Sequence, residues 1–168
     1  MIGVLVSGEG TNLQALIDAG LPISAVASNR ADAPALRRAR SAGIPAAVYQ
    51  DEEAMADWLE AQDVRVVVLA GYMRVLSPAF LDRFPGRIVN VHPSLLPAFP
   101  GLRAIEQALD AGVDETGVTV HLVDEGVDTG PVLRQEPVPV EPADTLVERI
   151  HAVEHRLLPE VVRELCAR

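Results

Sequence analysis

The sequence contains no lysine, one cysteine, few aromatic residues and no long uninterrupted apolar segment. Its 14 basic residues are therefore all arginines, and 24 acidic residues bring the net charge to −10. This balance disfavours a broad nucleic-acid or anionic-membrane surface, so any anion must be bound locally. The single Cys166 cannot form an intrachain disulfide, which excludes the disulfide-stapled secreted scaffolds.

The composition is that of an ordinary globular protein. With 168 residues, of which 49% are hydrophobic and 23% charged, the chain suits one domain covering residues 1–168. The first apolar stretch, residues 1–6, is too short for a membrane span and lacks the preceding charge of a signal peptide. We therefore expect a cytoplasmic protein.

Short β-branched segments alternate with segments of helical period, which predicts an α/β fold with a doubly wound, mainly parallel sheet. The predicted strands cover residues 2–6, 23–28, 46–49, 64–69, 87–91, 118–123 and 132–140. The predicted helices cover residues 12–19, 34–42, 52–61, 102–111 and 146–165, the last with a kink at Pro159. Strand 64–69 is apolar on both faces and should be central. Pro137 and Pro139 make 132–140 an antiparallel edge strand.

A glycine-rich turn, residues 7–12, follows the first strand and opens the first helix. Backbone N–H groups and the helix dipole converge there, which favours a phosphate. Leu13 replaces the third glycine of the dinucleotide fingerprint, so a nicotinamide cofactor is disfavoured. The alternative is that Thr11 and Gln14 form a capping box and the glycines only permit the turn.

Asn90 and His92 lie at the carboxyl end of strand 87–91, where open α/β sheets bind their ligands. Alternate residues of a strand share a face, so both side chains should emerge together. An asparagine can donate to a developing oxyanion and a neutral histidine can move a proton, a pairing suited to acyl or formyl transfer. The alternative is that both only satisfy backbone groups.

The acidic turn 124–131 offers Asp128 as a partner for His92, since a nearby carboxylate would favour the imidazolium. Otherwise the turn is a solvated loop. His151, Glu154 and His155 match the H-x-x-E-H zinc motif. A zinc hydrolase needs a third protein ligand, and the only later candidates, on the same helix, are Glu160 and Glu164. We therefore expect no metal.

Four segments together resemble the glycinamide ribonucleotide formyltransferases, which use 10-formyltetrahydrofolate in purine synthesis: LVSGEGTNLQAL, VVVLAGYMRVLSP, VNVHPSLLPAFPG and LVDEGVDTGPV. The match runs from the first strand to the last helix. The last two segments are shared by the wider formyltransferase group, whereas SGxGTNLQ looks specific to the enzymes that act on glycinamide ribonucleotide. The resemblance implies a Rossmann-like fold, 10-formyltetrahydrofolate as co-substrate, no metal, and a monomer or homodimer.

The resemblance also implies roles for individual residues, with the nucleotide side in the N-terminal half and the folate side in the C-terminal half. The implied catalytic residues are Asn90, His92 and Asp128, with His121 beside them. The residues implied to bind glycinamide ribonucleotide are Gly10, Thr11, Asn12 and Glu154. The residues implied to bind folate are Met73, Arg74, Val75, Leu76, Asn90, Val123, Asp124, Glu125, Gly126, Val127 and Asp128.

The sequence departs from the family pattern in two places. Acidic residues 51–53 stand where the family has an arginine that contacts folate, within a segment, 50–63, that looks shortened. The extra C-terminal strand and tail of family members are expected to be absent, which leaves one flank less covered or covered by a partner subunit.

Three other activities fit part of the pattern. A formyltetrahydrofolate hydrolase would use water in place of the amine. A methionyl-tRNA formyltransferase needs a tRNA surface, which an acidic chain without lysine does not offer. A non-catalytic nucleotide-binding module would leave Asn90, His92 and Asp128 unexplained.

Overall fold

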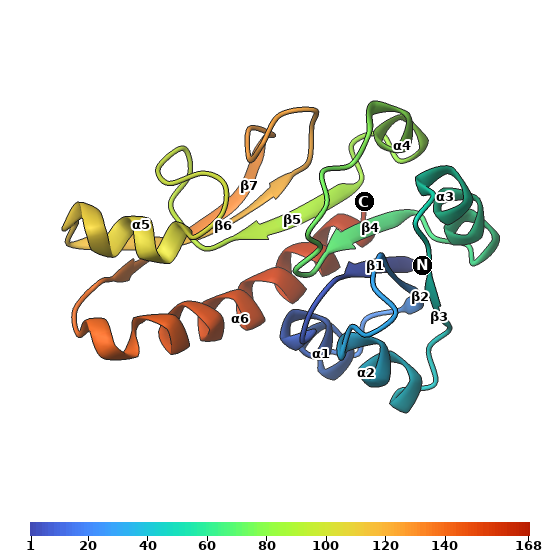
Figure 1. The fold of residues 1–168 in the computed structure, drawn as a ribbon, viewed down its shortest axis with the longest axis horizontal. Coiled ribbons are helices and arrows are strands. Elements are labelled where there is room, and N and C mark those ends of the chain that lie inside the picture. Colours follow the sequence, from blue (N-terminus) through green and yellow to red (C-terminus); the bar gives the residue numbers. More distant parts are fainter.

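The computed structural model describes residues 1–168 as one twisted sheet between two layers of helices (Figure 1). The strands are β1 (Ile2–Val6), β2 (Ile23–Ser28), β3 (Ala46–Val48), β4 (Val66–Leu69), β5 (Ile88–His92), β6 (Glu115–Leu122) and β7 (Val132–Pro139). They form a seven-stranded sheet in the order β3-β2-β1-β4-β5-β6-β7. The first five strands in this order, β3, β2, β1, β4 and β5, pair in parallel. Strand β6 pairs antiparallel with both β5 and β7. The predicted doubly wound, mainly parallel sheet is confirmed.

The helices cover both faces of this sheet. They are α1 (Thr11–Asp18), α2 (Ala35–Ser41), α3 (Glu52–Ala61), α4 (Pro78–Arg83), α5 (Ala104–Ala111) and α6 (Leu146–Cys166), with a 3-10 turn at Ala143–Thr145. Helices α1, α2 and α6 bury their apolar sides in one core, and α3 and α4 bury theirs in the other (Figure 1). None of the helices combines the length and the apolar composition that a membrane crossing would need.

The burial pattern of the strands explains their order. All four residues of β4 are buried, because their side chains alternate between the two cores, and β4 occupies the middle of the sheet as predicted. At the other extreme, Pro137 and Pro139 lie in β7, which is the predicted edge strand. Helix α6 continues through Pro159 to Cys166.

Helices α4 and α5 differ most from the prediction. Helix α4 was not predicted, because its six residues are too few to show an apolar period. Its start is nevertheless encoded, because the Ser77 hydroxyl accepts a hydrogen bond of 3.3 Å from the Phe80 N–H and Pro78 fits the first turn. Helix α5 begins only at Ala104, because Arg103 has a left-handed backbone conformation with φ of 60°.

The parallel strands bring the predicted motifs to the same edge of the sheet. Strands β1 and β5 both pair with β4 in parallel, so their carboxyl ends point the same way. Neighbouring strands are about 4.8 Å apart, which puts the ends of β1 and β5 roughly 10 Å from each other. The glycine-rich turn after β1 and the Asn90–His92 pair of β5 therefore lie at one edge.

Candidate active site at the carboxyl edge of the sheet

Two histidines face the carboxylate of Asp128. The Nδ1 atom of His92 lies 3.4 Å from Oδ2 of Asp128, and the Nε2 atom of His121 lies 3.6 Å from Oδ1. Both imidazoles are buried, and the Asp128 side chain is only 11% exposed. One carboxylate thus serves two rings that come from neighbouring strands, and the predicted approach of Asp128 to His92 is present.

The pairing of β5 with β6 places these side chains. Asn90 lies opposite His121 in the antiparallel register. Val89 and Val91 point into the apolar core beneath α6, so the alternating side chains of Asn90 and His92 emerge on the opposite face. The Nδ2 atom of Asn90 lies 3.5 Å from Nε2 of His121, which adds an amide to the cluster.

Backbone carbonyls define the protonation of one nitrogen in each ring. The Nε2 atom of His92 lies 2.8 Å from the Phe99 carbonyl oxygen, and Nδ1 of His121 lies 2.9 Å from that of Leu122. A carbonyl oxygen only accepts, so both of these nitrogens donate. The nitrogens left to face Asp128 are Nδ1 of His92 and Nε2 of His121. A proton on either of these two nitrogens would face the carboxylate.

The acidic turn is held in place by its own hydrogen bonds. Asp128 has a left-handed φ of 55°, and its Oδ2 accepts a hydrogen bond of 2.7 Å from the Gly101 N–H. This bond ties the turn to the proline-rich loop that follows β5. The Oδ1 of Asp124 accepts from the Thr129 hydroxyl at 2.7 Å and the Gly126 N–H at 2.9 Å. These two bonds lower the pKa of Asp124. Asp124 therefore shapes the turn, and Asp128 faces the histidines.

The glycine-rich turn has an open helix N-terminus. Gly10 precedes α1 with a φ of 78°, and a Cβ there would lie 2.5 Å from that of Ala35, so only glycine fits. No side chain caps α1, so the alternative capping box of Thr11 and Gln14 is wrong. The Gln14 amide donates to Asp18 instead. The first-turn N–H groups of α1 thus have no side-chain acceptor and can bind an anion.

Glu154 of α6 lies beside this turn. Its Oε2 accepts a hydrogen bond of 3.1 Å from Nδ2 of Asn12, and the residue is only 7% exposed. Burial raises the pKa of Glu154, and the bond from Asn12 opposes part of that effect. The rings of His151 and His155 are 6.2 Å apart, and no three His, Cys, Asp or Glu side chains are grouped as a metal site. The zinc alternative gains no support from this geometry.

The segment after β4 presents apolar side chains to solvent. Met73 and Val75 are exposed, Val75 by 76%, whereas Leu76 is buried in the core beneath α3 and α4. Val127, next to Asp128, is exposed as well. Exposed apolar side chains of this kind offer a surface on which the flat rings of a ligand can pack.

Sequence reasoning missed Ser7, which links the glycine-rich turn to this segment. Its hydroxyl donates to Oδ1 of Asn29 at 2.6 Å and accepts from the Met73 N–H at 2.8 Å. The position of Ser7 directly after β1 was the available signal, but its partners come from two other loops and cannot be read from local spacing.

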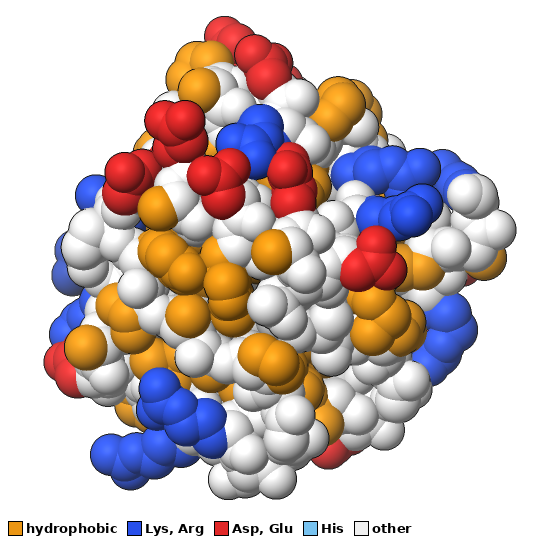
Figure 2. Space-filling model, turned by 90° about the vertical axis from the view of Figure 1, so that its right-hand side faces the viewer, with side chains coloured by type: hydrophobic (Ala, Val, Ile, Leu, Met, Phe, Trp, Pro, Cys, Tyr) orange, Lys and Arg blue, Asp and Glu red, His pale blue; other side chains and the backbone are white.

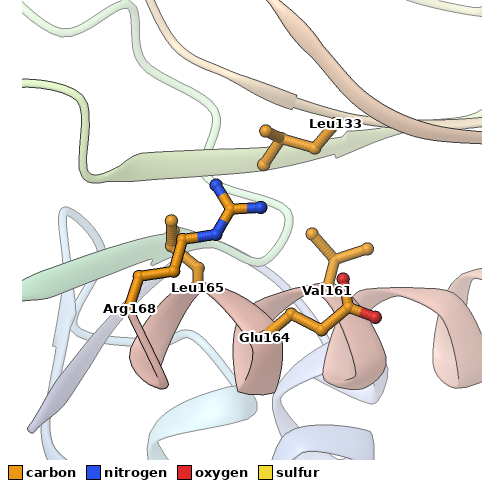
Figure 3. Close-up of a pocket in the computed structure, with 5 residues that line it drawn as sticks. All are labelled: Leu133, Val161, Glu164, Leu165 and Arg168. Carbon is orange, nitrogen blue, oxygen red and sulfur yellow. The ribbon is translucent and has the colours of Figure 1, made fainter.

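Two cavities lie away from these residues. One, of about 490 Å³, is lined by Asp51, Glu52, Glu53, Ala56, Ser77, Ala79, Phe80 and Arg83 between α3 and α4. It belongs to the face where acidic side chains gather (Figure 2). The other, of about 30 Å³, lies between β7 and the end of α6 and is lined by Leu133, Val161, Glu164, Leu165 and Arg168 (Figure 3). It has room for a water molecule rather than for a nucleotide.

Known proteins resemble this chain in sequence and in structure. The family model described as formyl transferase matches residues 1–162. The chain is 43% identical over 180 residues to phosphoribosylglycinamide formyltransferase of Haemophilus influenzae, covering 96% of this chain and 85% of that protein. It is 44% identical over 186 residues to the trifunctional purine biosynthetic protein adenosine-3 of Drosophila pseudoobscura, covering 99% of this chain and 14% of that protein. The solved structure of glycinamide ribonucleotide transformylase 1 from Geobacillus kaustophilus is 47% identical with a TM-score of 0.92, covering 98% of this chain and 97% of that one.

Proposed function

Because this chain belongs to the formyl transferase family, we propose that it transfers the formyl group of 10-formyltetrahydrofolate to the amine of glycinamide ribonucleotide, a step of purine biosynthesis. Relatives named for this activity share 43% and 44% of its residues over 96% of the chain. The contact between His92 and Asp128, at the sheet edge that also carries the Gly10 turn, is the observation that supports the proposal most directly.

The reaction requires one proton to change place. A C–N bond forms between the substrate amine and the formyl carbon, the bond from that carbon to N10 of the folate breaks, and the proton lost by the amine goes to N10. His92 is suited to carry this proton when its Nε2 exchanges the Phe99 carbonyl for the substrate, because Asp128 faces Nδ1 of the charged ring. The Asn90 amide is suited to donate to the formyl oxygen as it gains negative charge.

The nucleotide is bound by the other end of the site. The N–H groups of Gly10, Thr11 and Asn12 hold the substrate phosphate at the N-terminus of α1. Glu154 contacts the rest of the nucleotide from α6. The separation of roughly 10 Å between the ends of β1 and β5 is one that a ribose with a phosphate and a glycinamide can bridge.

The folate is bound by the segments that follow β4 and β6. Residues 73–76 and 123–128 lie next to Asn90 in this proposal, with the exposed Met73, Val75 and Val127 against the ring faces of the folate. Residues 51–53 are acidic, so this segment supplies no arginine to contact the folate. Asp51 instead caps α3, its Oδ1 accepting from the Glu53 N–H at 2.8 Å.

An assay of the purified protein with 10-formyltetrahydrofolate tests this function, run with and without glycinamide ribonucleotide. We expect tetrahydrofolate to appear only when glycinamide ribonucleotide is present, with one formylated product per folate consumed. Equal tetrahydrofolate production and formate release without glycinamide ribonucleotide would instead identify a hydrolase. No turnover under either condition would contradict both activities.

A further inference from the structure

We infer that Arg38 of α2 is a positioning residue for the phosphate: it holds the glycine-rich turn from behind and thereby orients the N–H groups that bind the anion. The inference rests on the proposed role of this turn as the phosphate site. It concerns a residue outside the turn, on a different βα unit, that makes no contact with the phosphate itself.

Helix α2 donates hydrogen bonds to two successive carbonyl groups of the turn. The Nε atom of Arg38 donates to the Glu9 carbonyl oxygen at 2.7 Å, and its Nη1 donates to Oε1 of Gln14 at 3.4 Å. The Ala35 N–H donates to the Gly8 carbonyl oxygen at 3.0 Å. The turn is thus bonded to α2 through its carbonyl side, and Arg38 supplies the only side chain that does this.

Peptide geometry means that these hydrogen bonds to the carbonyls also orient the N–H groups on the other side of the same peptides. In a trans peptide the C=O and N–H bonds point in opposite directions. With the Gly8 and Glu9 carbonyls directed at α2, the N–H groups of Glu9 and Gly10 must point away from it. Successive N–H groups with a common direction form an anion-binding concavity, whereas a carbonyl turned into it would repel a phosphate.

The turn needs such a restraint because of its glycines. Gly8 and Gly10 flank Glu9, and glycine adopts positive and negative φ with similar ease, so the peptides between them can rotate at little cost. Gly10 already has a φ of 78°, and its Cα face packs closely on Ala35. A hydrogen bond to the Glu9 carbonyl favours one orientation of the flexible peptide over the other.

Arg38 also adds positive charge behind the turn, in a chain without lysine. Its neighbours on the same helix, Arg37 and Arg40, are exposed and make no side-chain hydrogen bond or ion pair. Arg38 is half-buried, and its guanidinium donates to the Glu9 carbonyl and to the Gln14 side chain. The contrast within one helix separates a general effect of arginine from the specific effect of this position.

Substitution of Arg38 by methionine tests the inference, because methionine keeps the aliphatic packing and removes every donor. Arg37→Met is the matched control, and Arg38→Lys restores a charge and one donor group. The KM for glycinamide ribonucleotide, the KM for 10-formyltetrahydrofolate and kcat are measured together with the Kd of inorganic phosphate by calorimetry. Thermal melts establish that each variant is folded.

For Arg38→Met we expect the KM for glycinamide ribonucleotide and the Kd of phosphate to rise about tenfold, with kcat and the folate KM within about twofold. Arg38→Lys should recover part of the loss, and Arg37→Met should match the wild type. Equal behaviour of Arg38→Met and Arg37→Met would overturn the inference, as would a loss confined to kcat. If Arg38→Met does not fold, Arg38→Leu, which also lacks every donor, replaces it, and an unchanged Kd of phosphate overturns the inference.

The phosphate measurement separates this inference from the proposed function. A wild-type protein that binds phosphate but transfers no formyl group would contradict the proposed function, and the Arg38 variants would still show whether the turn is held as inferred. A wild-type protein that transfers the formyl group with an Arg38→Met variant of normal phosphate affinity would leave the function intact and overturn the inference alone.

Discussion

The side-chain amide of Asn12 on α1 donates a hydrogen bond of 3.1 Å to the carboxylate of Glu154 on α6, although the two residues are 142 positions apart. The first helix and the last helix therefore assemble the nucleotide side of the site together. Glu154 is buried, so hydration by water does little to stabilise its negative charge. This position has a cost that depends on pH.

The first prediction concerns stability and pH. Burial raises the pKa of Glu154 above its ordinary value of 4.5, so the folded chain binds this proton more tightly than the unfolded chain does. The contribution of Glu154 to the free energy of unfolding is therefore largest below pH 4.5 and is lost as the pH rises through the folded-state pKa. Glu154→Gln removes the charge and keeps an oxygen for Asn12. We expect its Tm to exceed that of the wild type at about pH 7 and to approach it at about pH 4.

Thermal melts across this pH range check the prediction, with Glu160→Gln, a more exposed carboxylate on the same helix, as the control. A Glu154→Gln variant that melts below the wild type at about pH 7 would show that the buried charge is stabilised after all.

The second prediction concerns turnover. Asn90 emerges beside His121 on the face opposite the apolar core, where its amide can donate to a developing negative charge. Removal of such a donor lowers kcat by on the order of 100-fold to 1,000-fold. We expect Asn90→Ala to fall in that range with smaller changes in both KM values. Steady-state kinetics decide this, and near-normal turnover by the variant would exclude the role.

The third prediction separates the two aspartates of the acidic turn. Asp128→Asn keeps an oxygen that can accept from Gly101 but removes the charge that faces both imidazoles. We expect kcat to fall by on the order of 100-fold, because the charged ring loses its partner. Asp124→Asn is the matched control, since Asp124 bonds only within the turn. Similar kcat values for the two variants would contradict the assignment.

The fold was predictable where burial is uniform and less so where it is not. Strands β1 and β4 are buried on both faces, so their existence follows from composition, as does the central position of β4. The proline content of β7 placed it at the edge. Helix α4 escaped prediction because its six residues show a capping serine and a proline but no period. The start of α5 depended on the left-handed backbone conformation of Arg103, which an arginine in the sequence does not predict.

The site was predictable in its residue types and in the approach of Asp128 to His92, but not in its other contacts. Alternation along β5 gave the shared face of Asn90 and His92, because that depends only on strand geometry. The approach of Asp128 to His92 depends on the path of a whole loop, which includes a left-handed residue and a bond to Gly101. The bridging hydroxyl of Ser7 was invisible, since its partners come from two other loops.

The last prediction concerns that hydroxyl. Ser7→Ala removes the acceptor of the Met73 N–H and the donor to Asn29 at once. Unpaired buried polar groups cost about 1–3 kcal/mol, so the Tm should fall. The freed segment after Met73 should also raise the KM for 10-formyltetrahydrofolate more than that for glycinamide ribonucleotide. Ser24→Ala is the control, because its hydroxyl donates to the Gln62 carbonyl at 2.7 Å, before β2 reaches the site.

Melting curves and the two KM values, measured for both serine variants, distinguish a local from a general effect. If Ser7 acts on the folate segment, both variants lose stability but only Ser7→Ala changes the folate KM. A folate KM that is the same in both variants would mean that residues 73–76 keep their position without the hydroxyl, held by the burial of Leu76 and by the hydrogen bond of 3.2 Å from Arg74 to the Gln50 carbonyl.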